Sequence, residues 1–477
     1  MHPPTAADGS GAAFSRRIPL IVAAAFFMET LDSTIVVTSL PAIAHSLGES
    51  TLELTASITI YLVAMAAFVP TAGWASERYG ARNVFAAAIG VFTLASLLCA
   101  LSQTFWALIG ARLLQGTAAA FMSPVGRLVV LREAPKDRII DAIGLIVWPG
   151  LLGPVIGPPL GGFITTYASW QWIFLINIPL GLLGVYLVLR YVPGHEAGTR
   201  TRFDATGFVL TAVALAALIQ GLSLVAERGG AMVAGGVFVA VGLACGFAAV
   251  RHALRHPAPL LALGATRIPT FALSTVTAGM IARIAISMTP FLLPLMFQIG
   301  FGANPFEAGI MLLVYMAGNL AMKSVTTPIL HRWSFRDVIL VNGTLCVAAL
   351  VGCGFLSPQV PAPVIYGVLF AAGMTRSMHF TSVNTLAFAD MPPHLTPGAT
   401  TLAAMAQQVA GALGVAVAAL ALGLFQSFRA GAQLSLSDFQ NAHLAAAGLM
   451  AIGVVWALRL PPDAGAELSR RKGTDRA

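Results

Sequence analysis

Two carboxylates lie inside the first long apolar segment of the chain, from about residue 18 to residue 41. Glu29 and Asp32 are three residues apart, so they share one face of a helix. The segment can span a bilayer, which needs about 20 helical residues. A carboxylate at membrane depth is costly unless it is paired, hydrated or protonated. The two acids could therefore take up and release protons; the alternative is a buried ion pair that only orients helices.

The composition indicates a polytopic membrane protein. Of 477 residues, 57% are hydrophobic and only 10% are charged. The cysteines all fall in apolar segments, which predicts buried thiols and no disulfides: Cys99, Cys245, Cys346 and Cys353. The nine histidines are scattered without ligand spacing, so we expect no metal site and no enzyme.

Fourteen apolar segments predict an all-α fold with an internal repeat. They lie at about 18–41, 54–75, 83–102, 105–131, 141–165, 171–192, 205–226, 231–250, 270–297, 305–330, 336–357, 362–387, 397–425 and 440–460. We expect six-helix bundles over 18–192 and 270–460, a linker over 193–269 with two extra helices, and tails over 1–17 and 461–477. Two parallel six-helix halves around a central cavity is a known transporter plan.

The basic residues predict the orientation. Of the 27 lysines and arginines, 20 fall on the side of the N-terminus, only Arg228 and Arg429 fall on the other side, and five lie within segments. Positive residues stay in the cytoplasm, so both termini are expected there. Retention of basic residues on the cytoplasmic side of the lipid bilayer also accounts for the net charge of +8, so we expect no nucleic-acid partner.

An arginine in the fourth segment offers a partner for the acids. Asp32 lies roughly nine residues, and Arg112 roughly seven, from the outer ends of their helices, so both are about 10–14 Å deep. The two side chains can therefore meet. Arg112 could respond to protonation of Asp32, or the pair could be a fixed structural contact.

The second half carries buried cations of its own. Arg283, Lys323 and Arg376 lie within segments, His379 is one turn from Arg376, and Asn384 follows. They could line a substrate cavity opposite Glu29 and Asp32. They could equally form structural pairs or extend their charged ends to the membrane–water interface.

The loop after the second segment resembles a signature of the major facilitator superfamily. The residues that carry it are Gly73, Glu77, Arg78, Gly80 and Arg82. In that family the loop acts as a conformational latch. Glu77 replaces the usual Asp, which changes the latch geometry. Residues 111–120, with Arg112 and Gln115, are similar to the same family's fourth-helix motif, and we include Gln115 among the cavity candidates.

The fifth segment resembles the antiporter motif of drug:proton antiporters in that superfamily. Its residues are Gly153, Pro154, Gly157, Pro158, Gly161 and Gly162. Small residues about every four positions predict a flat, kinkable helix face. Residues 170–181 and 31–41 are similar to the sixth- and first-helix motifs of the fourteen-helix drug:proton antiporter family, although the usual Asn near Val37 is missing.

The resemblance implies a proton-coupled exporter of small amphipathic compounds in a Gram-negative inner membrane, working as a monomer by alternating access. No phosphate-binding loop of the ATP-driven kind is found, because Met322 precedes Lys323-Ser324 where Gly is required. We therefore expect no cofactor, only the proton gradient. The alternatives are a narrow-specificity metabolite exporter and a membrane sensor.

Overall fold

The structure is a computed structural model that describes residues 16–134, 138–194, 202–226, 231–429, 433–461 and 464–465. The predicted tails lie largely outside these residues. The helices of the first half are α1 (Arg17–Leu47), α2 (Thr51–Leu54), α3 (Ala56–Phe68), α4 (Thr71–Tyr79), α5 (Ala81–Ala100), α6 (Phe105–Glu133), α7 (Ile139–Tyr167), α8 (Trp172–Leu175) and α9 (Asn177–Tyr191).

Two extra helices and a second set of six follow. The helices are α10 (Ala205–Ala226), α11 (Ala231–Arg255), η2 (Leu263–Arg267), α12 (Pro269–Phe271), η3 (Ala272–Val276), α13 (Ala278–Leu295), η4 (Met296–Gly300), α14 (Pro305–Arg332), α15 (Phe335–Gly354), α16 (Ala362–Ala389), η5 (Pro393–Leu395), α17 (Thr396–Phe428) and α18 (Leu436–Ala457). The order of elements therefore follows the predicted six, two and six.

Within the described ranges, thirteen helices or helical runs are long and apolar enough to cross a membrane. The remaining predicted segment, 362–387, forms α16, which has 28 residues. Its length suffices for a bilayer, but Arg376, His379 and Asn384 lower its mean hydropathy. The chain is an all-α, multi-pass membrane protein.

Some predicted single segments are interrupted. The segment 54–75 is divided into α2, α3 and α4, with the last break between Phe68 and Thr71 at Pro70, which cannot donate a backbone hydrogen bond. Ser50 and Glu53 form a capping box at the start of this run. The segment 270–297 contains two π-helical turns, η3 and η4, and extends to Gly300.

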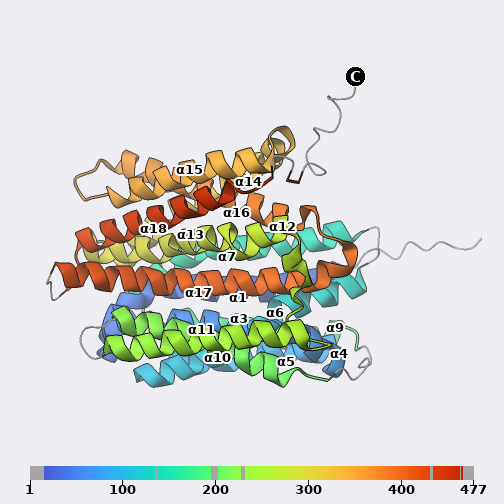
Figure 1. Ribbon diagram of the computed structural model, residues 1–477. Helices are drawn as coiled ribbons and strands as arrows, with labels where there is room; N and C mark the ends of the chain where they lie inside the picture. Colours follow the sequence, from blue (N-terminus) through green and yellow to red (C-terminus); the bar gives the residue numbers. More distant parts are fainter. Residues whose placement is uncertain are drawn as a thin grey trace, which may run out of the picture.

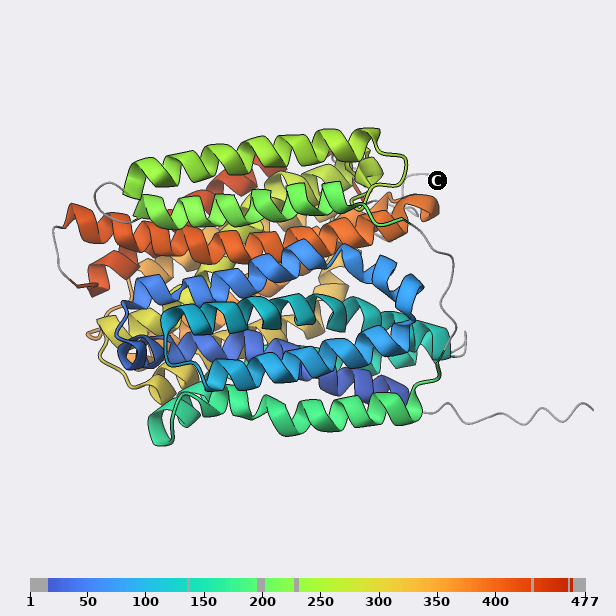
Figure 2. The ribbon, with the colours of Figure 1, turned by 90° about the horizontal axis from the view of Figure 1, so that it is seen from below.

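The two bundles meet along two seams. In each half the helices pack in neighbouring pairs, such as α1 with α7 and α14 with α16. Between the halves, α7 packs against α14 and α3 packs against α17. Figures 1 and 2 show the hairpin of α10 and α11 at the edge of the molecule, beside α17. The hairpin therefore adds to the bundles without separating them.

The apolar core is shared by both bundles at one end of the molecule and mostly divided between them at the other. We call the end that holds Arg17, Arg82 and Arg190 the basic end, and the end that holds Leu47 the distal end. One cluster joins both bundles near the distal end, including Leu40 of α1 and Phe297 after α13. Toward the basic end each bundle has a cluster of its own, and a smaller cluster joins α3, α10 and α17.

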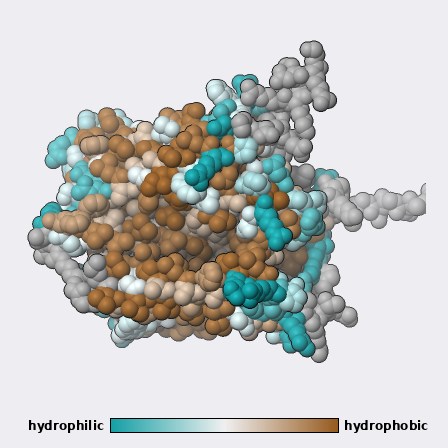
Figure 3. Space-filling view, in the orientation of Figure 1, coloured by the Kyte–Doolittle hydropathy of each residue, from teal (hydrophilic) through white to brown (hydrophobic). Residues whose placement is uncertain are grey.

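The outer surface suits contact with lipid. Figure 3 shows a face covered mostly by apolar side chains, with hydrophilic residues gathered mainly toward its ends. Exposed apolar residues are frequent on α11, among them Val233, Leu243 and Phe247. Exposed apolar surface of this extent marks a membrane-facing surface.

Candidate functional site

Asp32 lies at the centre of a buried polar network formed by three helices of the first bundle. Its Oδ2 accepts a hydrogen bond from Arg112 Nη1 at 2.7 Å. Its Oδ1 accepts from Gln115 Nε2 at 2.8 Å and from Asn177 Nδ2 at 2.9 Å. All four side chains are buried. The structure thus brings the Asp32 and Arg112 side chains together; their depth in a membrane and their part in proton transfer stay predictions.

Arg112 connects this network to α3. Its Nε donates to the backbone carbonyl of Ser57 at 3.2 Å, and its guanidinium carbon lies 4.3 Å from the centre of the Tyr61 ring. Gly116 lets α6 approach closely, because a Cβ there would lie 2.3 Å from the Tyr61 carbonyl oxygen. A buried guanidinium held in this way has a fixed orientation. A change of charge at Asp32 can therefore be transmitted to α3 through the Arg112 side chain.

Two members of the network were missed by sequence analysis. Asn177 stands 145 positions from Asp32, and only its polarity within an apolar segment distinguishes it. Ser96 also joins, since its hydroxyl accepts from Gln115 Nε2 at 2.8 Å and from Asn177 Nδ2 at 3.4 Å. The candidate cavity residue Gln115 is fully buried and lies between Asp32 and Ser96.

Glu29 belongs to a separate contact. The Oε2 atom of Glu29 accepts a hydrogen bond from the Ser123 hydroxyl at 2.8 Å, and Glu29 is 4% exposed. Arg127, also on α6, is close enough to interact with it electrostatically. Both acids of α1 therefore point toward α6, each with its own partners.

The glycines of the antiporter-like motif bring α7 against α1. A Cβ on Gly153 would lie 2.2 Å from Thr30 Oγ1, and one on Gly157 would lie 2.3 Å from Thr34 Oγ1. At Gly161 the nearest atom would be the carbonyl oxygen of Ile35, at 2.5 Å. These positions flank Asp32 along α1, so the motif packs directly against the helix that carries the acid.

The rest of the motif lies at the seam between the bundles. A Cβ on Gly162 would meet the carbonyl oxygen of Pro305, and one on Gly309 would meet that of Pro158 at 2.5 Å. Pro154 and Pro158 lie within a helix that runs without interruption from Ile139 to Tyr167. The small residues of α7 form the predicted flat face, which packs against both α1 and α14.

The latch-like loop joins α4 to α5. Its candidates are Gly73, Glu77, Arg78, Gly80 and Arg82. Gly80 has φ of 81°, a left-handed conformation that favours glycine. Arg82 donates to the backbone carbonyl of Leu189, which ties α5 to α9. Glu77 and Arg78 are exposed, and the described ranges contain no ion pair of Glu77. Arg78 instead covers two aromatic rings of α4.

The cations of the second bundle are gathered around α16. Arg283 Nη2 donates to Asn384 Oδ1 at 2.5 Å, and Lys323 Nζ donates to Thr381 Oγ1 at 2.8 Å. Arg376 lies on α16 itself. His379 is 3% exposed, helps to line a small pocket with residues of α13, α15 and α18, and is close enough to Arg283 to interact with it electrostatically. His379 therefore lies beside Arg283.

A large cavity lies away from the buried acids. It has a volume of about 1200 Å³ and lies between α3, the start of α6, α17 and the extra hairpin. Its lining includes Glu53, Thr59, Trp106, Gln220 and Phe238. Its walls belong to both bundles and to the hairpin, so it is a feature of the seam and not of the Asp32 network.

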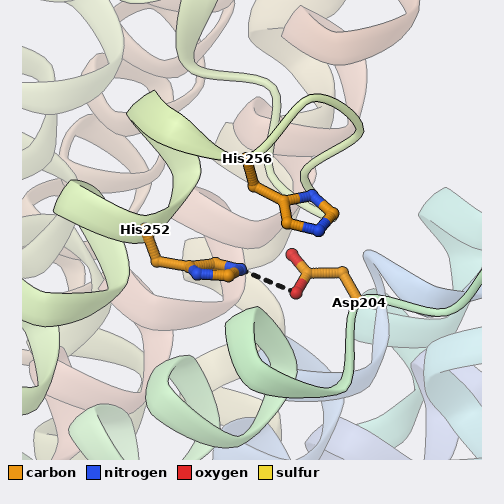
Figure 4. A group of neighbouring side chains, drawn as sticks. All are labelled: Asp204, His252 and His256. Carbon is orange, nitrogen blue, oxygen red and sulfur yellow. Dashed lines mark hydrogen bonds and ion pairs between the residues drawn. The ribbon is translucent and has the colours of Figure 1, made fainter.

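A group that sequence analysis missed closes the basic end of the extra hairpin. Asp204, His252 and His256 meet there (Figure 4), and their ligand-type atoms lie within 4.8 Å of one another, a spacing that could hold a metal ion. Asp204 is already satisfied by protein: its Oδ1 bonds to His252 Nε2 and accepts from Gly207 N, both at 2.8 Å, and its Oδ2 accepts from Leu260 N at 3.1 Å. These bonds tie α10, α11 and the following loop together.

The sequence matches the Major Facilitator Superfamily over residues 22–415, and the chain belongs to that family. Together with the helical membrane-spanning fold, this defines a membrane transporter. The chain is 38% identical over 465 residues to "Putative multidrug resistance protein MdtD" of Escherichia coli O6:H1, covering 95% of this chain and 96% of that protein. It is 37% identical to the protein of the same name from Citrobacter koseri, with the same coverage.

Solved structures share the fold at low sequence identity. The POT family transporter PepTSo matches with a TM-score of 0.67 and 12% identity, covering 93% of this chain and 97% of that one. A D-xylose-proton symporter matches with a TM-score of 0.64 and 13% identity, covering 91% and 96%. These structures support the major facilitator fold.

Proposed function

We propose that the chain is a proton-coupled transporter that exports small amphipathic compounds, with Asp32 as the site that exchanges protons. The observation that carries this proposal is the Asp32 network: a buried carboxylate held by an arginine and two amides. Protonation of Asp32 would cancel its charge and leave Arg112 without its anionic partner. A buried charge that loses its partner is strongly destabilised, so the surroundings must rearrange.

The contacts of Arg112 suggest which helices take part in that rearrangement. Arg112 holds Ser57 and Tyr61 on α3, and α3 packs against α17 of the second bundle. The Tyr61 hydroxyl has no hydrogen-bond partner among the described residues, so it is free to accept one after a shift. Protonation of Asp32 on α1 can thus shift the equilibrium between two arrangements of α3 against α17.

The division of the apolar core supports alternating access. One cluster joins the bundles near the distal end, whereas toward the basic end each bundle has a cluster of its own, and α3 and α17 remain joined by a smaller cluster with α10. An arrangement closed distally and divided at the basic end is one of the two states that rocking bundles need. Exposed Glu77 fits a latch that is released in this state and engages in the other.

The direction of transport and the class of substrate are proposed from similarity to known proteins. The relatives carry a name that refers to multidrug resistance, and the fifth-helix glycine pattern resembles that of drug:proton antiporters. We place the chain in the cytoplasmic membrane with the basic end and both termini inside, because positive residues are retained there. It is proposed to work as a monomer, driven by the proton gradient and without a cofactor.

The test uses purified protein in proteoliposomes with an imposed pH gradient and a pH-sensitive dye inside. A panel of lipophilic cations, neutral drugs and organic anions is added to wild type and to Asp32→Asn. We expect substrate-dependent proton flux in wild type and none in the variant, while size-exclusion profiles remain alike. Flux with an intact pH response in Asp32→Asn would refute Asp32 as the proton site, and Glu29→Gln would be tested next.

A further inference from the structure

The second bundle holds positive charge at membrane depth without acids to balance it. Arg283 lies in α13, Lys323 in α14 and Arg376 in α16, each well inside its helix. Between residues 270 and 460 the sequence has four acids: Glu307, Asp337, Asp390 and Asp438. Each lies in the first turn of a helix or directly after its last residue. No carboxylate of this bundle therefore lies beside the three cations.

All three cations converge on one part of α16. Lys323 reaches Thr381 and Arg283 reaches Asn384, and these two acceptors are three residues apart on α16. Arg376 starts the same stretch, which has nine residues (376–384) and extends over about 12 Å of helix. Lys323 and Arg376 are close enough to interact electrostatically. Like charges brought together in this way repel each other, since screening is weak away from bulk water.

The hydrogen bonds of these cations leave donors unused. Arg283 is 4% exposed, and its Nε has no partner among the described residues. The Nε of Arg376 is likewise buried without a partner in the described part of the chain, and its guanidinium lies 5.8 Å from the centre of the Tyr315 ring. A planar guanidinium with free donors matches a carboxylate or a similar oxyanion.

The acids of the first bundle do not balance this charge. Asp32 is neutralised by Arg112 at 2.7 Å, and Glu29 lies near Arg127. At membrane depth the first bundle thus pairs its charges, whereas the second bundle leaves three positive ones uncompensated. Uncompensated ions inside a membrane protein are costly and mark ligand pathways.

We propose that Arg283, Lys323 and Arg376 form the substrate-binding site and that the substrates are amphipathic organic anions. The anionic group, a carboxylate or sulfonate, binds between Lys323 and Arg376. The apolar body packs beside the rings of Tyr315 and Phe380, which is one turn from Arg376. This inference rests on the proposed export function and narrows its substrate class.

The test compares three probes that share one ring system: 1-naphthoate, 1-naphthamide and 1-naphthylmethylammonium. Binding is measured to the full-length protein in phosphatidylcholine nanodiscs. We expect the carboxylate to bind and the other two to bind at least tenfold more weakly. Lys323→Gln should weaken carboxylate binding about tenfold, because a charge-assisted hydrogen bond is lost. Lys323→Arg should retain binding, and Arg459→Gln, at an exposed position of the basic end, should change nothing.

Each other result overturns the assignment. Preference for the ammonium, no carboxylate binding to wild type, or equal binding by folded Lys323→Gln would show that these cations do not select the substrate. The phosphate of an anionic lipid shares the same chemistry, so binding is repeated with phosphatidylglycerol in the nanodiscs. Competition by this lipid that is lost in Lys323→Gln would identify a lipid site in place of a substrate site.

Failure of this inference can be told from failure of the export proposal by flux in proteoliposomes. Proton flux driven by the ammonium and absent in Asp32→Asn would uphold the exporter and refute the anion site. Lys323-dependent carboxylate binding without any proton flux would uphold the anion site and refute proton coupling.

Discussion

A Cβ on Gly162 of α7 would lie 2.2 Å from the carbonyl oxygen of Pro305, the first residue of α14. This is the tightest described approach between the two bundles on that seam, and it lies in their distal half. Nearby, the amide of Phe306 donates to Thr166 Oγ1 at 3.2 Å. Backbone therefore meets backbone here, and no flexible side chain can yield to an added atom.

Gly162→Ala should disfavour the distally closed state. Overpacking of a tight contact costs about 1–3 kcal/mol, so the population should move toward separation of α7 from α14. Spin labels at Ser46, in the last turn of α1, and at Gln359, in the distal loop between α15 and α16, should show a larger fraction of long distances by double electron–electron resonance. Gly150→Ala on the same helix is the control, since a Cβ there would meet no atom within 4 Å. Identical distance distributions in both variants would contradict the expectation.

Arg112→Lys should uncouple transport without unfolding the protein. Lysine keeps the charge beside Asp32 but cannot donate from Nε to Ser57 or stack as a plane on Tyr61. We expect the number of protons moved per substrate to fall and the efflux rate to drop about tenfold, as for the loss of one charge-assisted hydrogen bond. Flux and proton uptake are measured together, with Arg127→Lys beside it. Full coupling in Arg112→Lys would remove Arg112 from the mechanism.

Asp204→Asn should lower thermal stability in a pH-dependent way. Burial opposes ionisation of Asp204, but the amides of Gly207 and Leu260 and the ring of His252 together hold its pKa below the usual 3.8. The folded pKa is the lower one, so the carboxylate stabilises the fold above about pH 4 and loses this effect as pH falls further. The melting temperature of Asp204→Asn should therefore lie below that of wild type near neutral pH and approach it in acid.

Two controls accompany this measurement. Asp141→Asn changes an exposed carboxylate and should leave the melting temperature nearly unchanged at every pH. Chelator should also have no effect if Asp204, His252 and His256 act through their own hydrogen bonds. Stabilisation of wild type by Zn²⁺ that is lost in His256→Ala would instead establish a metal site.

Gly80→Ala should destabilise the turn between α4 and α5. Its φ of 81° is costly for a residue with a Cβ, by about 1 kcal/mol or more. Gly73→Ala is a matched control, because a Cβ there would meet no atom within 4 Å. Melting temperatures of the two variants are compared. A stable Gly80→Ala protein would show that the turn adapts.

Much of the architecture could be predicted because apolar length dictates membrane helices. Depth along a helix also predicted that Asp32 and Arg112 meet, since the bilayer fixes a common reference plane. The partners Asn177 and Ser57 could not be predicted, because rotation of each helix about its own axis depends on packing. The meeting of Asp204 with His252 and His256 depends on the path of a loop, which no periodicity encodes. The π-helical turns around α13 gave no sequence signal either.

The position of the α10–α11 hairpin has a mechanical consequence. Helix α10 packs against α3 of one bundle and α17 of the other, and residues from all three helices form one apolar cluster. In the proposed alternating-access cycle, an element that packs against both bundles must slide along at least one of them. The hairpin therefore bridges the seam between α3 and α17, and we expect its apolar contacts, such as those of Ile219, to resist separation of the two bundles.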